Sequence, residues 1–431
     1  MDASSTDQSF PRKTSVLIVG GGIVGVTAAL FLAERGVPVV LCEKGRIAGE
    51  QSSRNWGWIR KGKRDARELP LMLESARLWS RIAAELESDI GYGVRGTTYL
   101  AATDADIARH QAWLEKTAHF QMDSTLLSAA QTDALIGRSD RRFKGALHTP
   151  SDATAEPRLA VPAMARRAAV LGATILENCA VRLIERQAGN VRSAVTEHGE
   201  ISCDSVILAG GVWSRTFLEN LGLDLPQLAV KSSVMRTSAA PEFISGTLGA
   251  TSASLRRRQD GGYTIARSGA AEFQLIPAAF HHFAAFLPII RDRWRIVKIR
   301  AGSEFFGPLG KARWKADETS PFERLRIMDP EPDRKLLANV LRAARVLHPQ
   351  LAGVTAVETW GGLIDVMPDE LPVIDTPPGW QGLVLATGLS GHGFGIGPGV
   401  GLAAAQLVLG ETMRVDVSDF AFSRFNRRLA A

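Results

Sequence analysis

After a polar start, the chain shows a strand, a helix and a second strand in succession. Residues 15–19 form a mostly β-branched run that ends in glycine, which is typical of a fully buried parallel strand. Apolar residues then recur at helical spacing over 28–33, and Gly36 is expected to end this helix because glycine adopts a positive φ without strain. Residues 37–41 predict the second buried strand. The pattern therefore predicts one βαβ unit.

The rest of the chain also mixes helices with strands. The spacing of apolar residues predicts helices over 69–86, 104–117, 128–136, 157–171, 278–290 and 333–347. Strands are predicted over 94–103, 174–176, 181–185, 191–195 and 205–208, and strands with loops from 228 to 306. Near the end, a buried strand over 382–386 enters a glycine-rich turn, and a helix follows over 399–409. These patterns predict a mixed α/β fold.

The segments that suit nucleotide binding lie at both ends and in the middle of the chain, so the predicted domains are interleaved. A length of 431 residues suits about two domains. Residues 1–14 are polar and are expected to form a disordered tail. The expected nucleotide-binding domain comprises 15–90, 155–225 and 355–431, and the substrate domain comprises 91–154 and 226–354.

Composition narrows the class of protein mainly by exclusion. Hydrophobic residues make up 45% and charged residues 22% of the chain, which excludes a disordered or fibrous protein. The three cysteines, Cys42, Cys179 and Cys203, are too scattered for a disulfide framework or a zinc site, so a reducing cytoplasm is expected. No segment is predicted to span a membrane. The net charge of +6 is spread along the chain, and no nucleic-acid partner is predicted.

A glycine motif, Gly20-x-Gly22-x-x-Gly25, follows the first strand and opens the first helix. Gly20 permits the tight turn, Gly22 lets backbone N–H groups approach a pyrophosphate, and Gly25 lets the helix pack closely on the strand. Glu43 ends the second strand, where a carboxylate can accept hydrogen bonds from a ribose. The motif in this setting predicts dinucleotide binding; a glycine turn without a ligand is the alternative.

Two later glycine-rich segments distinguish between dinucleotides. Residues 206–214 form a strand that opens onto glycines, and residues 388–397 form a turn between a strand and a helix. A second helix N-terminus surrounded by glycines suits a long cofactor with further polar groups, such as the O2/N1 edge of a flavin. The three segments together favour FAD over NAD, although each alone is compatible with an ordinary turn.

The most specific segments are 43–52 and 206–215, and 179–185, 319–323 and 369–374 accompany them. With these segments the chain resembles the D-amino acid oxidase-like superfamily of FAD-dependent amine and amino acid oxidoreductases, and most closely its bacterial L-amino acid deaminases. The similarity covers nearly the whole chain after residue 15. It implies an FAD-binding Rossmann-type domain interleaved with a substrate domain built on a large antiparallel sheet.

The resemblance also implies how the cofactor is held. Lys44, Gln51 and Ser52 would line it, and Val181 would present its backbone to the adenine. Non-covalent FAD is expected, because relatives that attach it use a Cys in the C-terminal half or a His soon after the ribose-binding Glu, and this chain has neither. The residues expected to bind FAD are Gly20, Gly22, Gly25, Glu43, Lys44, Gln51, Ser52, Ser53, Trp56, Val181, Gly211, Trp213, Gly388, Gly391, Gly393 and Gly395. No metal site is predicted.

The candidate substrate-binding residues are inferred from what the oxidation of an amino acid requires. A hydride leaves Cα for the flavin, so the protein must hold the carboxylate and keep the amine neutral. The fork of an arginine matches two carboxylate oxygens, and the resemblance places Arg267 at the carboxylate-binding position of the deaminases. A surface arginine on a strand is the alternative. Arg60 and Arg64 are secondary candidates that could equally be loop charges or contacts to the cofactor phosphates.

Two departures from the family pattern affect the substrate range. Many amine oxidases of the superfamily carry an arginine in the segment equivalent to 361–365, where this chain has Asp365. Asp365 would attract a cationic substrate group if it faced the flavin; otherwise it is structural or solvated. His392 stands where the deaminases have an aromatic residue, and it could donate to substrate or tune flavin reoxidation. The alternative is a side chain that only packs in a turn.

Residues 278–305 correspond to an insertion that is associated with the membrane in the deaminases. An apolar run over 278–290 is followed by five basic residues, which suits the surface of an anionic bilayer. A buried helix followed by an exposed strand edge explains the same residues and is slightly preferred. The segment is therefore a candidate lid or membrane-surface insertion.

The expected activity is FAD-dependent oxidation of an α-amino acid to the imino acid, which water converts to the 2-oxo acid and ammonia. The expected catalytic residues are Arg267, His392, Asp365 and Arg60. The reduced flavin would pass electrons to oxygen or to a respiratory acceptor. One alternative is oxidation of a secondary amine, either an N-alkyl glycine or an imino acid such as proline. Another is a role as the flavin-binding subunit of a hetero-oligomeric dehydrogenase. The expected location is the cytoplasm, with peripheral contact to the inner face of the cytoplasmic membrane as an option.

Overall fold

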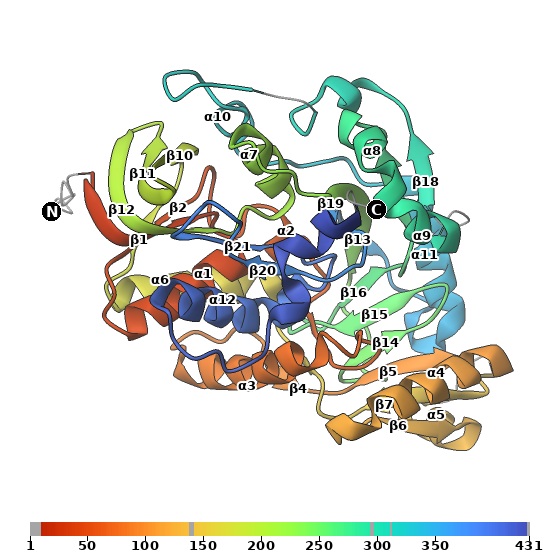
Figure 1. Cartoon of the computed structure of the whole chain (residues 1–431). Helices are drawn as coiled ribbons and strands as arrows, with labels where there is room; N and C mark the ends of the chain where they lie inside the picture. The colour runs from red at the N-terminus through yellow and green to blue at the C-terminus, as the bar shows by residue number, and fades with distance from the viewer. Residues whose placement is uncertain (1–9, 138–141, 294–296, 311–312, 429–431) are drawn as a thin grey trace, which may run out of the picture.

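The computed structural model describes residues 10–137, 142–293, 297–310 and 313–428, and two large sheets dominate it (Figure 1). The described residues form a first sheet of eight strands, in the order β10-β11-β12-β1-β2-β9, with β21 beside β12 and β20 beside β21. Its strands are β1 (Lys13–Val19), β2 (Val39–Cys42), β9 (Thr174–Leu176), β10 (Val181–Gln187), β11 (Asn190–Thr196), β12 (Gly199–Leu208), β20 (Val373–Asp375) and β21 (Leu383–Thr387). β1 includes the last two residues of the expected tail, and residues 1–9 lie outside the description.

The centre of the first sheet is parallel, as the βαβ pattern predicts. β1 pairs in parallel with β2 and with β12, and β12 pairs in parallel with β21. Four helices pack together with this sheet: α1 (Ile23–Glu34), α3 (Leu69–Glu85), α6 (Pro157–Val170) and α12 (Gly393–Leu409). Every residue of α1 up to Ala33 is buried, because this helix is apolar all round and packs against both the sheet and its neighbours. The α/β fold class is confirmed.

The C-terminal helix begins six residues earlier than the sequence predicts. The prediction placed its start at residue 399, whereas α12 starts at Gly393. Gly388 and Gly391 do lie in the turn, but Gly393, Gly395 and Gly397 lie inside the helix, and Gly397 and Gly401 permit close contact with α1. A Cβ on Gly397 would lie 2.7 Å from a side-chain carbon of Ile23, and one on Gly401 would lie 2.2 Å from Oγ1 of Thr27. Helix contact, which the local sequence does not report, explains these glycines.

Gly401→Ala is therefore expected to destabilise the protein by about 1–3 kcal/mol, because the added methyl group overlaps Thr27. An ordinary helical glycine would behave in the opposite way, since alanine is the better helix former. Urea unfolding monitored by circular dichroism measures the change. The matched control is Gly353→Ala, because a Cβ there would meet nothing within 4 Å. A Gly401→Ala protein as stable as this control would contradict the close contact.

The second sheet has ten strands in the described residues, in the order β18-β17-β13-β16-β15-β14-β5-β7-β6, with β19 beside β13. They are β5 (Thr97–Ala101), β6 (Thr125–Ser128), β7 (Gly145–Thr149), β13 (Leu228–Thr237), β14 (Thr247–Gly249), β15 (Ser254–Arg257), β16 (Tyr263–Ala266), β17 (Ala271–Gln274), β18 (Val297–Arg300) and β19 (Ala356–Val366). Most neighbours are antiparallel, but β14 with β5 and β17 with β18 are parallel. The sheet is thus largely antiparallel, as expected, and contains two parallel pairs.

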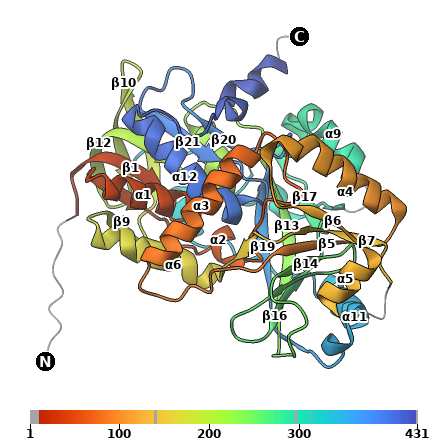
Figure 2. The same cartoon turned by 90° about the horizontal axis from the view of Figure 1, so that it is seen from below.

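Smaller elements complete the second half of the molecule. Seen from below, α4 (Asp104–Thr117) and α5 (Ala129–Ile136) lie beside β5, β6 and β7, and α11 (Arg334–Leu347) lies beside β16 (Figure 2). The side chains of Thr103, Ser128 and Asp333 cap the N-termini of these three helices by accepting hydrogen bonds from backbone N–H groups of the first turn. The remaining strands and α-helices, apart from short 3₁₀ turns, are β3 (Trp58–Ile59), β4 (Gly93–Val94), β8 (Ala153–Thr154), α2 (Gln51–Arg54), α7 (Ser214–Asn220), α8 (Pro277–His281), α9 (Phe283–Arg293) and α10 (Pro321–Arg324).

The segment predicted as one buried helix over 278–290 is two helices with much apolar surface exposed. α8 ends at His281 and α9 begins at Phe283, and among residues 283–292, whose burial is described, only Phe286 is buried. Phe280, Phe283, Ile290 and Ile299 are exposed, and Phe306 is 89% exposed. The preferred interpretation is therefore wrong for the buried helix, but its exposed strand edge is confirmed, because β18 lies at the edge of the second sheet and Lys298, Ile299 and Arg300 are exposed. Of the basic residues that follow, Lys298 pairs with Asp333 and Arg300 with Glu272, and Arg295 lies outside the described residues. Membrane contact stays a prediction.

Across the described residues, no helix combines the length and apolarity that crossing a bilayer requires.

Candidate functional site

One cavity of about 1300 Å³ lies where the two sheets meet. The turn after β1, the end of β2, the segment around α2, the turn after β12 and the start of α12 line one part of it. Residues of β13, β19 and the turn between β16 and β17 line the other. Its volume exceeds that of an ordinary small-molecule pocket, so it has room for a dinucleotide cofactor together with a small substrate.

The first glycine motif is built as its spacing predicts. Gly20 has φ 109°, and a Cβ there would lie 2.5 Å from the carbonyl oxygen of Ala209. A Cβ on Gly25 would lie 2.0 Å from the oxygen of Gly20, so this glycine serves helix–strand packing and does not line the cavity. Gly22 is the N-cap of α1 and does line it. The N-terminus of α1 thus faces the cavity, where its partial positive charge favours a phosphate.

Glu43 and Ser52 are held at the same end of the cavity. The two carboxylate oxygens of Glu43 accept hydrogen bonds of 2.7 Å from the backbone N–H groups of Gly21 and Gly45. Burial raises the pKa of Glu43, and these two hydrogen bonds partly offset the rise. Ser52 Oγ accepts a hydrogen bond of 2.9 Å from the N–H of Ile23, at the start of α1. Both residues line the cavity beside the glycine turn.

Several other expected cofactor residues are bound to protein groups. Lys44 Nζ donates to Glu50 at 2.7 Å and to two backbone carbonyls, and Trp213 Nε1 also donates to Glu50. Lys44 and Trp213 still line the cavity, as do Gln51, Trp56, Val181 and Gly211. Ser53 donates to the carbonyl of Glu50 and does not line the cavity. Its expected contact with FAD therefore has no support in the geometry.

Asp365 connects three distant segments of the chain. Its oxygens accept hydrogen bonds from Gln51 Nε2 at 2.8 Å, from Gln227 Nε2 at 3.1 Å and from the N–H of Leu389 at 3.0 Å. The residue is 2% exposed, and burial raises its pKa. With its acceptor positions used by protein donors, Asp365 has the geometry of the structural alternative, and its predicted attraction for a cationic substrate is not favoured.

The three candidate arginines differ in how they are bound. Arg267 is exposed in the turn between β16 and β17 and lines the cavity, and no ion pair or side-chain hydrogen bond is found for it within the described residues. Arg60 also lines the cavity and donates to the carbonyl of Gly62 at 2.5 Å. Arg64 is buried and donates to Glu68 at 3.3 Å, and burial lowers its pKa to about 10. Arg267 is thus the arginine best placed to receive a carboxylate from solution.

The C-terminal glycine segment brings His392 to a buried carboxylate. His392 is the N-cap of α12, and its Nδ1 lies 3.1 Å from Glu68. Burial lowers the pKa of His392 to about 4, and the attraction of Glu68 offsets only part of this effect. Burial alone would raise the pKa of Glu68, but His392 and Arg64 bring it down to about 2. At neutral pH the pair is therefore a neutral imidazole that donates through Nδ1 to a carboxylate.

His392→Asn is expected to reduce the loss of stability on mild acidification. Because the unfolded chain takes up a proton near pH 6.5 and the folded imidazole does so only near pH 4, the free energy of unfolding falls as pH decreases through this window. Between pH 7 and 5, where Glu68 remains ionised, the variant should lose about 1–2 kcal/mol less than the parent. Urea unfolding at both pH values measures this, with the exposed His119→Asn as control. An identical pH dependence in parent and variant would contradict the lowered pKa.

The glycines of this segment do not all have the same role. Gly391 and Gly393 line the cavity, whereas Gly388 and Gly395 do not. A Cβ on Gly388 would meet Met367, and one on Gly395 would lie 3.0 Å from the guanidinium of Arg64. These two glycines therefore serve close packing, and their expected contact with FAD has no support in the geometry.

The structure adds cavity residues that sequence reasoning did not select. Lys63, Tyr99 and Arg109 line the cavity near Arg60, and Glu68 stands behind His392. Burial lowers the pKa of Lys63, and the nearby Arg60 and Arg109 lower it further. Arg60, Lys63 and Arg109 thus place three basic side chains on one part of the cavity wall, which suits an anionic substrate group. A glutamate ahead of an amphipathic helix is common, so Glu68 carried no signal of its role.

Comparison with known proteins places this geometry among flavoenzymes. Residues 15–407 match the model of the DAO family, described as FAD-dependent oxidoreductase. The structure is similar to that of L-amino acid deaminase from Proteus myxofaciens in complex with anthranilate, with a TM-score of 0.93 and 29% identity over 99% of this chain and 96% of that one. Glycine oxidase from Pseudomonas putida is 24% identical over 94% of this chain and 97% of its own. Sarcosine oxidase subunit beta from an Arthrobacter species is 25% identical, over 96% of this chain and 92% of that protein.

Proposed function

Because this chain belongs to the DAO family of FAD-dependent oxidoreductases, we propose that it oxidises a primary α-amino acid to the imino acid, which water hydrolyses to the 2-oxo acid and ammonia. One observation carries the proposal: a single cavity is lined both by the glycine turn at the start of α1 and by Arg267, whose guanidinium has no partner among the residues that the structure describes. The similarity to an L-amino acid deaminase supports it.

The residues of the cavity fit FAD. The N-terminus of α1 would receive the pyrophosphate, Glu43 the ribose, and the wall with Val181 the adenine. When bound, FAD accepts the hydride that leaves the substrate Cα. Non-covalent binding is part of the proposal, and denaturation by acid should release all of the yellow cofactor into the supernatant. Colour that stays with the precipitated protein would contradict it.

The cavity residues would prepare the substrate for hydride loss. Arg267 would hold the substrate carboxylate and so orient Cα. His392 donates through Nδ1 to Glu68, which leaves Nε2 as an acceptor. His392 lines the cavity, and this acceptor would take a hydrogen bond from a substrate that binds as the neutral amine, the form that oxidation requires. Arg60 would serve as a further cationic contact on the same wall.

Oxidation of a secondary amine is the second candidate, and the similarity to sarcosine oxidase subunit beta favours it. The two candidates give different products. A primary amino acid yields equal amounts of 2-oxo acid and ammonia, whereas an N-methyl amino acid oxidised at its methyl group yields formaldehyde and the free amino acid.

The test is turnover of the purified, FAD-loaded chain with L-, D- and N-methyl amino acids, with oxygen or a dye as electron acceptor. We expect ammonia and 2-oxo acid in equal amounts from primary amino acids, and slower reaction of N-methyl amino acids. Faster reaction of the N-methyl substrates with release of formaldehyde would overturn the proposal in favour of the second candidate. Complete inactivity of the chain alone would also overturn it and would favour a subunit of a larger dehydrogenase.

A further inference from the structure

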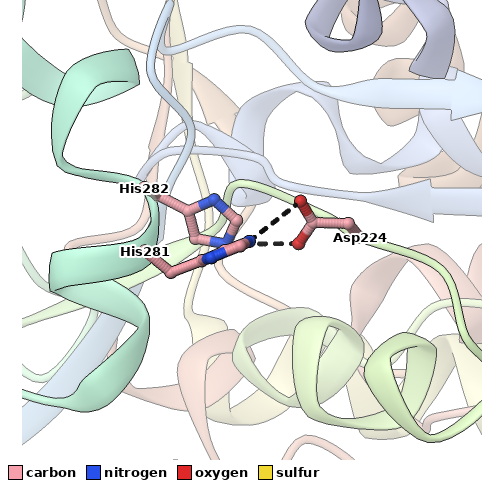
Figure 3. Close-up of side chains that lie close together, drawn as sticks. All are labelled: Asp224, His281 and His282. Carbon is pink, nitrogen blue, oxygen red and sulfur yellow. Dashed lines mark hydrogen bonds and ion pairs between the residues drawn. The ribbon is translucent and has the colours of Figure 1, made fainter. Parts of the chain in front are cut away.

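Three metal-ligating side chains from two separate segments meet outside the cavity. Asp224 lies in the loop after α7, and His281 and His282 lie at the C-terminal end of α8. Figure 3 shows both imidazole rings directed toward the Asp224 carboxylate. Nε2 of His281 is 3.3 Å from Oδ2 of Asp224, and Nε2 of His282 is 3.5 Å from Oδ1. None of these three residues lines the large cavity.

The separations are those expected between ligands of one metal ion. Zinc binds histidine nitrogen and aspartate oxygen at about 2.0–2.2 Å, so neighbouring ligand atoms of a tetrahedral site lie about 3.3–3.5 Å apart. The ligand atoms of the three residues all lie within 4.8 Å of one another. Two imidazoles and one carboxylate are a donor set that suits Zn²⁺ and its neighbours in the first transition row.

The burial of His282 is an independent indication of a ligand. Its side chain is 5% exposed, and its Nε2 has no hydrogen-bond partner in the described part of the chain. A buried polar atom is normally paired, since leaving it unpaired costs about 1–3 kcal/mol. This nitrogen points at a carboxylate that is too far away for a hydrogen bond and correctly placed for a shared ion.

We propose that Asp224, His281 and His282 bind one divalent transition-metal ion of the zinc class, with water in the remaining position. The ion would join the loop after α7 to α8. Helix α9 follows directly, and its residues Ile289 and Asp292 line the large cavity. The bound ion would therefore hold one wall of the cavity in place without touching the substrate.

The site is tested by metal binding to the FAD-loaded full chain, prepared without a histidine tag and stripped with a chelator. Calorimetric titration with Zn²⁺ is expected to show one ion per chain, and bound Zn²⁺ is expected to raise Tm because it stabilises the folded state. Titration with Co²⁺ should give the visible absorption of a four-coordinate ion. Less than one ion per chain at saturating Zn²⁺ would overturn the proposal.

Variants show whether the ion binds at these residues. Asp224→Asn and His282→Gln are each expected to weaken Zn²⁺ binding by about a hundredfold, whereas His119→Gln, which alters an exposed histidine elsewhere, should leave the affinity unchanged. Asp224 is half-exposed, so its variant stays informative even if His282→Gln impairs folding. Equal affinity in the Asp224→Asn and His119→Gln proteins would overturn the assignment. Calorimetry without substrate measures metal binding and does not depend on turnover. A failure of metal binding can therefore be distinguished from a failure of the proposed oxidation.

Discussion

Arg267→Ala is expected to lower kcat/KM for α-amino acids by about 30- to 1,000-fold, mostly through KM. Losing the charged partner of a desolvated carboxylate costs about 2–4 kcal/mol, which corresponds to that range. Arg267 is exposed in a turn and no protein partner is found for it within the described residues, so the fold itself should be unaffected. Steady-state kinetics with one good amino acid substrate and with the amine that lacks its carboxylate measures the effect.

The amine without a carboxylate is the decisive control for this variant. Its kcat/KM should change less than about threefold, because it makes no contact that the variant removes. Arg267→Lys should recover part of the loss, since it restores the charge without the bidentate fork. Arg60→Ala is the matched variant on the same wall and should have a smaller effect. An equal loss of kcat/KM for the amino acid and for the amine in the Arg267→Ala protein would reject Arg267 as the residue that binds the carboxylate.

Arg256→Met is expected to lower the free energy of unfolding by about 3–5 kcal/mol, because the buried Glu156 carboxylate then keeps only the N–H of Gln259 and the more distant Arg258. The Arg256 side chain is 2% exposed and donates to both oxygens of Glu156, at 2.9 and 2.8 Å. Its Nε also donates to the carbonyl of Trp56 at 2.5 Å. Trp56 lines the cavity, so FAD affinity should fall together with stability. Urea unfolding and fluorescence titration with FAD measure the two effects.

Two comparison variants separate a buried pair from an ordinary ion pair. The double variant Arg256→Met/Glu156→Leu should recover part of the lost stability, because no charge is left buried. Arg158→Met removes a more exposed pair with Glu358 and should cost about 1 kcal/mol or less. If Arg256→Met lowers the free energy of unfolding no more than Arg158→Met does, the buried pair does not stabilise the protein as expected.

The features that were predicted correctly depend on local physical signals. The first βαβ unit follows from two short apolar runs and one glycine at a helix end, and all three signals lie within a single stretch of sequence. Glycine spacing likewise predicted the turn at Gly20 and the close packing at Gly25. The family match confirms the resemblance and the class of enzyme, an FAD-dependent oxidoreductase.

The features that were missed depend on contacts between distant residues. Glu68 and His392 are far apart in sequence, and nothing in either segment indicates their pairing. The start of α12 was misplaced because glycine is a poor helix former, whereas the reason for its glycines is the neighbouring helix α1. Asp365 could be interpreted only once its partners Gln51 and Gln227 were located. The metal-ligand cluster gave no motif, because Asp224 and the two histidines lie on separate elements.

Anaerobic mixing of the FAD-loaded protein with a panel of L-, D- and N-methyl amino acids tests the central claim most directly. The account predicts that at least one α-amino acid bleaches the visible absorbance of the oxidised flavin within a single turnover, and that admitting an electron acceptor restores it. A flavin that stays oxidised with every member of the panel would contradict the account.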